Sequence, residues 1–170
     1  FRSSPVICLL AFIMDGQSFQ AQSLYDSDKV QEIRITFPTG DWDKKLDSLH
    51  TADPDLRLVA TKVILNGIAY DSAGIRYKGN STYNPTRVKN PLNIKLDFIR
   101  DDQSYEGVNT LKLSNGFMDP SFLREALGYQ IVRQYMPAAL ANFIKVFVND
   151  TYLGLYTNVQ DLDNDFLEQH

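Results

Sequence analysis

Residues 92–99 have the sequence LNIKLDFI, in which apolar and polar side chains alternate from Leu92 to Phe98. Because successive side chains of a strand point to opposite faces of a sheet, this period of two predicts a half-buried strand. The apolar set is expected to face the core, which leaves Asn93, Lys95 and Asp97 on the polar face.

Upstream of this strand, three further segments have strand patterns: residues 29–37, 59–65 and 74–78. Asn66-Gly67 follows the second of them and is the strongest short signal for a hairpin turn, so it predicts a return strand at 68–70. Between the first two, apolar residues recur at helical spacing from Trp42, and they predict a short amphipathic helix that ends near Pro54.

Downstream, Asp119 and Pro120 have the residue types of an N-cap and a first helical position. They predict a long helix over about 120–135. Its apolar residues, among them Leu123, Leu127 and Ile131, are expected to pack the helix on the sheet.

A short strand at 111–113 precedes that helix, and a hairpin of strands 142–148 and 152–159 about Asn149-Asp150 follows it. The order is strands, then a helix, then a hairpin. This order predicts an α+β fold with a mostly antiparallel sheet and one long packed helix.

The composition limits the classes of function. The chain has 170 residues, 44% of them apolar, which suits one globular domain. No apolar run approaches the roughly 18 residues of a membrane span, and a net charge of −4 does not indicate nucleic acid as a partner. With Cys8 as the one cysteine and two histidines, a disulfide within the chain and a thiolate–imidazole zinc site are excluded.

The N-terminal residues have the pattern of a signal peptide. Arg2 supplies a basic segment, residues 6–14 are apolar, and small or polar residues follow through Ala21. We therefore predict that residues 1–21 are removed and that the protein is exported, to the periplasm, the cell surface or the medium. A buried strand at 6–14 is the alternative.

Four stretches carry a resemblance to a known family. They are GIRYKGNST at 74–82, KNPLNIKL at 89–96, DPSFLRE at 119–125 and VFVNDTYLGLY at 146–156, the last followed by Asp163 and Phe166-Leu167. In this order and at this spacing they resemble the CotH (spore coat protein H) family over residues 25–168.

CotH proteins have an atypical protein-kinase-like fold and phosphorylate spore coat proteins on serine, with ATP and a divalent metal. The resemblance implies that residues 22–170 are the N-lobe and hinge of such a fold, with ATP and Mg²⁺ or Mn²⁺ as cofactors and a protein as the substrate. No stretch resembles the C-lobe, which brings the catalytic base and the metal-binding carboxylates. No catalytic residue is therefore expected in this part.

The resemblance also implies a nucleotide-binding turn. Gly79-Asn80-Ser81 allows close approach of the backbone to a ligand and offers polar donors. Arg76 and Lys78 lead into this turn. Without the family, an ordinary surface hairpin is the alternative.

Two lysines are candidates for binding phosphate. Lys95 lies on the polar face of its strand, and Lys89 is nearer to the turn. Glu125 is expected to pair with that lysine, and Arg124 to brace the loop. The alternatives are solvated charges for the lysines and compensation of the helix dipole for Glu125.

Three positions depart from the family pattern. Lys78 stands where arginine is usual and lacks its bidentate fork, Asn90 replaces the second lysine of a pair, and Gln160 stands where glutamate is common.

Asp161 and the two aspartates that alternate after it lack the glycine of a calcium loop, so they are interpreted as a solvated helix start.

The rival function for the whole chain is a non-catalytic binding module, such as a degenerate kinase homologue.

Overall fold

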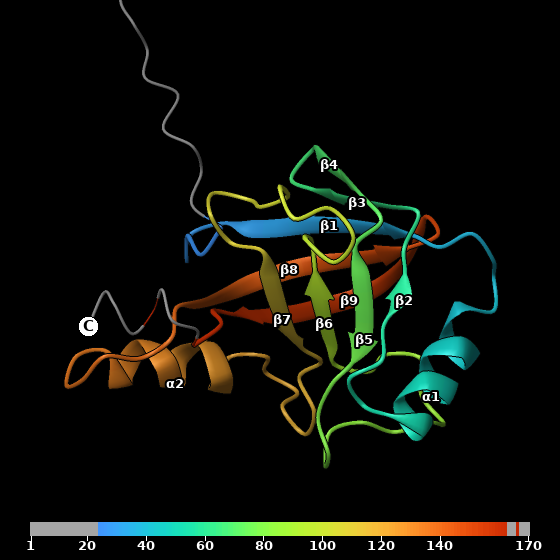
Figure 1. Ribbon diagram of the computed structural model, residues 1–170. Coiled ribbons are helices and arrows are strands. Elements are labelled where there is room, and N and C mark those ends of the chain that lie inside the picture. The colour runs from blue at the N-terminus through green and yellow to red at the C-terminus, as the bar shows by residue number, and fades with distance from the viewer. Residues whose placement is uncertain (1–23, 163–165, 167–170) are drawn as a thin grey trace, which may run out of the picture.

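The computed structural model describes residues 24–162 and Phe166. In this part of the chain it has one nine-stranded sheet and two helices (Figure 1). The predicted signal peptide, residues 1–21, lies outside the described residues, as do Asp163, Asp165 and Leu167. Neither described helix combines the length and apolar character needed to cross a bilayer.

The strands are β1 (Val30–Thr36), β2 (Leu58–Val59), β3 (Lys62–Leu65), β4 (Ile68–Asp71), β5 (Gly74–Tyr77), β6 (Leu92–Lys95), β7 (Thr110–Ser114), β8 (Ala141–Val148) and β9 (Thr151–Val159), and the helices are α1 (Trp42–Ala52) and α2 (Arg124–Val132). Their order in the sheet is β2-β5-β6-β7-β9-β8-β1-β3-β4. All neighbouring strands are antiparallel except β1 and β8, which are parallel. The predicted α+β class and the mostly antiparallel sheet are confirmed.

The sheet curls around the main core. Gln103, in the loop between β6 and β7, donates from its side chain to the carbonyls of Leu96 and Asp71, at 2.7 and 2.8 Å. It thereby ties the end of β6 to the edge strand β4. Inside the curl lie the apolar residues of both halves of the sheet, and α1 adds Leu46, which is 1% exposed.

Both predicted hairpin turns are confirmed. Asn66 and Gly67 have φ of 49° and 88°, and Asn149 and Asp150 have φ of 45° and 63°. Two consecutive residues with positive φ give the turn whose twist matches that of the flanking strands.

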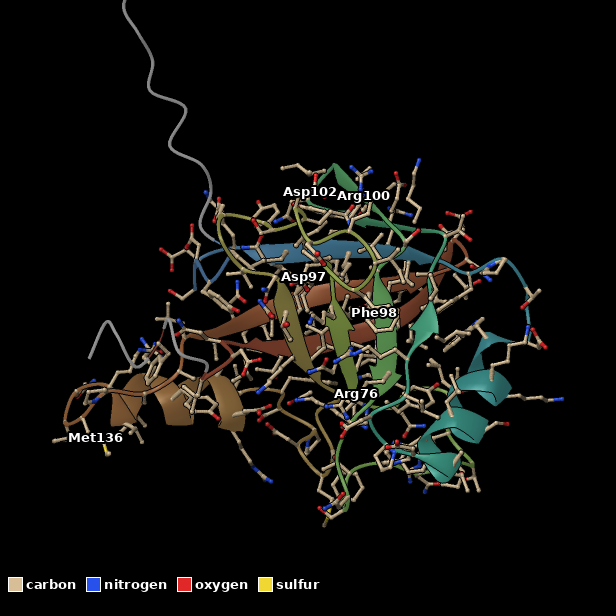
Figure 2. All side chains as sticks on the ribbon, in the orientation of Figure 1. Arg76, Asp97, Phe98, Arg100, Asp102 and Met136 are labelled. Carbon is tan, nitrogen blue, oxygen red and sulfur yellow. The ribbon has the colours of Figure 1, made fainter. Side chains whose placement is uncertain are left out.

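The predicted strand at 92–99 is shorter in the structure, because β6 ends at Lys95. Leu92, Ile94 and Leu96 are buried as expected. Phe98 instead turns to the outer face, where its ring lies against Gly74; a Cβ on this glycine would be 2.4 Å from the ring. Figure 2 shows Phe98 beside β5.

The prediction of one long packed helix over 120–135 is wrong. Phe122 has a φ of 59°, which interrupts a right-handed helix, so α2 begins at Arg124. The Asp119 carboxylate accepts from the backbone N–H groups of Ser121 and Arg124, at 3.1 and 2.8 Å, and forms a turn before the helix instead of the predicted N-cap.

The predicted packing face of α2 is also wrong. Leu123, Leu127 and Ile131 are 52%, 49% and 48% exposed. The helix instead packs through Ala126 and Tyr129 on a small cluster that includes Ala141 of β8 and Val159 of β9. These strand residues point away from the main core, so α2 and the core lie on opposite faces of the sheet. The two helices lie at opposite ends of the sheet (Figure 1).

Candidate functional site

A cavity of about 510 Å³ lies where the loop after β5 meets the end of β7 and the start of α2. The loop after β5 and the loop between β7 and α2 both run along the lower edge of the sheet in Figure 1. The volume of the cavity is in the range of sites for small molecules. It is lined by Lys78, Gly79, Thr82, Pro91, Ser114, Asn115, Gly116, Phe117, Met118, Asp119, Arg124, Glu125 and Thr157.

Lys78 is the half-buried cation of this cavity. It follows β5 directly, and its backbone N–H donates to the Pro91 carbonyl at 3.0 Å, which holds the base of the loop closed. Its Nζ donates to Ser114 Oγ at 3.4 Å, and within the described residues it forms no ion pair. Burial lowers the pKa of Lys78, and the Glu125 carboxylate partly opposes this effect.

Ser114 connects this lysine to α2. Its hydroxyl donates to Glu125 Oε1 at 3.0 Å while it accepts from Lys78, so the three residues form one hydrogen-bonded chain. β7 pairs with β6 and β9, and this register brings Ser114 opposite Thr157. The strand register therefore decides which lysine lies near Glu125.

Gly79 has a structural reason to be glycine. Its φ is +88°, and an added Cβ would be 2.3 Å from Thr82 Oγ1. No other residue fits this tight turn without strain. The neighbouring Asn80 and Ser81 are exposed and do not line the cavity.

The loop that contains Gly79 is anchored at several points. Tyr83 Oη donates to Asp47 Oδ1 of α1 at 2.8 Å. Asn90 is 1% exposed, and its side chain donates to the carbonyls of Asn84 and Arg87 at 3.0 and 2.6 Å. The asparagine that departs from the family's lysine pair thus holds the loop together.

Arg124 and Glu125 line the cavity, but neither has the partner that the sequence suggested. Arg124 Nη1 donates to the Met118 carbonyl at 3.0 Å, so it braces the loop before α2 and not the turn at Gly79. Glu125 is bound to Ser114 and not to Lys95. Asp119 accepts from Ser121 and from the Arg124 N–H, and these hydrogen bonds lower its pKa.

Lys95 lies far from this cavity. It is four residues beyond Pro91, or about 13 Å along the strand, and its ammonium is 3.9 Å from the Asp97 carboxylate. The expected pair of Lys95 and Glu125 is therefore not formed.

Lys89 and Arg76 are also outside the cavity lining. The Lys89 ammonium lies 4.7 Å from the centre of the Phe122 ring and 5.2 Å from that of Tyr156, and burial lowers its pKa. Arg76 donates to the Pro54 carbonyl at 2.7 Å and pairs with Asp55 at 3.1 Å. Figure 2 shows Arg76 beside β5.

Ser114 and a further lysine, Lys112, lie on the same face of β7 and were not predicted from the sequence. Lys112 forms an ion pair with Asp161, so this aspartate is not merely a solvated residue at a helix start. The alternation through Thr110–Ser114 is the signal that could have found both, because it places Lys112 and Ser114 on the polar face.

The described residues do not gather a metal site. They contain no group of three or more histidine, cysteine, aspartate or glutamate side chains that could hold a metal ion. At the cavity itself the carboxylates are Asp119, which is occupied by hydrogen bonds, and Glu125.

A comparison with protein families matches residues 75–170 to the model described as CotH kinase protein. This match covers more than half of the chain. The chain belongs to the CotH family. The CotH match includes β5 from its second residue onward, β6 to β9, α2 and every residue that lines the cavity, although it begins later than the expected 25–168. No curated protein matches the sequence.

Proposed function

We propose that this chain is the nucleotide-binding part of an exported CotH-like kinase, which transfers phosphate from ATP to serine in protein substrates. Membership of the CotH family supports the reaction class. The observation that carries the proposal is Lys78, a half-buried cation without an ion pair in the described structure, at the wall of a cavity large enough for a nucleotide.

Phosphoryl transfer depends mainly on positioning and on neutralising charge, so a cation and exposed backbone amides are the groups that it needs. ATP, when bound, supplies the phosphoryl group. Lys78 is placed to neutralise its phosphates, and Gly79 allows the backbone to approach them. Ser114 and Glu125 hold the lysine in position through their hydrogen bonds.

This arrangement, a curled sheet with a helix whose glutamate is linked through Ser114 to the lysine that directly follows a strand, supports an assignment as the N-lobe and hinge of a kinase-like fold. The present residues do not fit the Mg²⁺ or Mn²⁺ site, because they gather no set of three possible ligands in the described part. We propose that a second lobe supplies the metal-binding carboxylates and the catalytic base.

The test compares Lys78→Met with Lys95→Met in ATP titrations followed by calorimetry. Removal of the phosphate-binding charge should weaken ATP binding about tenfold or more for Lys78→Met. Lys95→Met removes an equal charge outside the cavity and should change the affinity less than about twofold. An equal effect of both variants contradicts the assigned site. Absence of ATP binding in the parent protein favours a non-catalytic binding module.

A further inference from the structure

The turn at residues 116–119 places two large apolar side chains at the wall of the cavity. The Asp119 N–H donates to the Gly116 carbonyl at 3.1 Å, so Phe117 and Met118 are the two central residues of the turn. They line the cavity although they are 40% and 78% exposed. Turn centres are usually polar residues, glycine or proline, so this pair is unusual.

Met118 is held in a strained conformation. Its φ is 54°, at a turn position where positive φ normally calls for glycine or asparagine. Arg124 fixes it from two sides, since its guanidinium donates to the Met118 carbonyl and its backbone N–H donates to Asp119. The Phe122 ring packs on Gly116, where an added Cβ would be 2.8 Å away. Contacts with Arg124 and Phe122 therefore hold Met118 in a backbone conformation that its residue type does not favour.

The cavity thus has two chemically different walls. Lys78 and Gly79 present a cation and an accessible backbone, which suit phosphate. Phe117 and Met118 present an aromatic ring and a thioether, which suit the flat face of an aromatic ligand. An inorganic polyphosphate has no group for the second wall, whereas a nucleotide has both.

We infer that Phe117 and Met118 form a platform for the nucleobase, which makes this site select nucleotides over inorganic polyphosphate. The inference rests on the proposed nucleotide-binding function. It assigns base recognition to the turn before α2 and phosphate recognition to the loop after β5.

The experiment measures the affinity of the whole protein for ATP and for inorganic tripolyphosphate by calorimetry. In the parent, ATP should bind about tenfold more tightly than tripolyphosphate, as expected for one stacked base. The double variant Phe117→Ala/Met118→Ala should lose this advantage and keep its tripolyphosphate affinity within about twofold. Tyr135→Ala/Met136→Ala removes two exposed side chains outside the cavity and should bind both ligands like the parent.

Other outcomes overturn the inference in distinguishable ways. Equal weakening of both ligands means that the turn supports the phosphate site and does not contact the base. Equal affinity of the parent for both ligands, lost together in Lys78→Met, overturns the platform but retains the phosphate site. Absence of binding of either ligand overturns the proposed function as well. If the double variant is unfolded, Met118→Gly, which relieves the strained φ, repeats the comparison.

Discussion

Lys78 combines two properties at the scale of a single residue: it is half-buried, and within the described structure it has a hydroxyl but no carboxylate as its direct partner. Burial of a charge without a counter-charge opposes folding, and the lowered pKa of this lysine expresses that cost. Because Lys78 destabilises the unliganded protein and lines the cavity, a role in binding a ligand explains its presence best.

We therefore expect Lys78→Met to keep the stability of the parent or to raise it by up to about 1 kcal/mol. Lys112→Met is the control, because it leaves Asp161 without its ion-pair partner and should cost about 1 kcal/mol. Urea unfolding of the three proteins measures both values. A loss of more than about 1 kcal/mol for Lys78→Met would show that this lysine stabilises the fold.

The same comparison has a pH dependence whose sign follows from the lowered pKa of Lys78. The folded protein releases this proton at a lower pH than the unfolded chain, which has the ordinary value of 10.5. Any gain in unfolding free energy of Lys78→Met over the parent is therefore complete at neutral pH. This gain disappears as the pH rises past about 10.5, because the parent's lysine is then neutral in both states.

Gly79 allows a second test at this scale. Gly79→Ala introduces both a strained φ and a close contact with Thr82, whereas Gly107, with a φ of +85°, has open space around it. Gly107→Ala should cost about 1 kcal/mol for the backbone alone, and Gly79→Ala about 1–3 kcal/mol more. Equal losses in thermal unfolding would show that Thr82 moves aside freely.

At the scale of elements, α2 shows that an apolar helix stripe does not by itself identify the buried face. The sheet contacts Ala126 and Tyr129, and the larger side chains of Leu123, Leu127 and Ile131 remain half-exposed. The cluster on which α2 packs consists of Ala139, Ala141 and Val159, so the buried contact of the helix is small.

Leu127→Ala should therefore destabilise the protein by less than about 1.5 kcal/mol, because half of the side chain already contacts solvent. Leu111→Ala, at a fully buried site in β7, should cost about 2–5 kcal/mol. Chemical unfolding distinguishes the two. A loss of that larger size for Leu127→Ala would mean that α2 is buried in the intact protein.

The loop after β5 depends on α1 through Tyr83. Burial, and next the hydrogen bond to Asp47, raise the pKa of Tyr83 to about 12. The unfolded chain loses this proton near pH 10, so the stabilising contribution is complete below pH 10 and is lost as the pH approaches 12.

Tyr83→Phe lacks this titration and loses one hydrogen bond, at a cost of about 1 kcal/mol at neutral pH. Between pH 10 and 12 the parent should lose the extra stability against unfolding that it has over the Tyr83→Phe variant. Parallel slopes of stability against pH in the two proteins would contradict a role of the Tyr83 hydroxyl in fixing the loop.

For the molecule as a whole, the turns and most strands could be predicted from local sequence signals, whereas the contacts between distant strands could not. Asn66-Gly67 and Asn149-Asp150 determine their turns locally, and alternation placed most strands correctly. The site was different, because the register of β5, β6 and β7 decides that Lys78 and not Lys95 reaches Ser114 and Glu125. No short stretch of the sequence determines how these three strands are aligned with one another.

Export is a further expectation for the whole protein. A signal peptidase should cut after Ala21 and leave Gln22 as the new N-terminus, two residues before the first described residue, Leu24. N-terminal sequencing of the protein from its native host checks this. A mature protein that retains residues 6–14 would contradict the expectation.

The parallel pairing of β1 with β8 has a consequence for how the protein is made. Val30 pairs with Phe143, more than a hundred residues later, and within the described residues β8 is the strand that joins β1, β3 and β4 to the other strands. At a synthesis rate of about 10 residues per second, β1 waits roughly 10 seconds for its partner. Such non-local pairing also slows folding. Under the proposed export, this interval would leave the nascent chain without its finished sheet while transport machinery that accepts unfolded chains engages it.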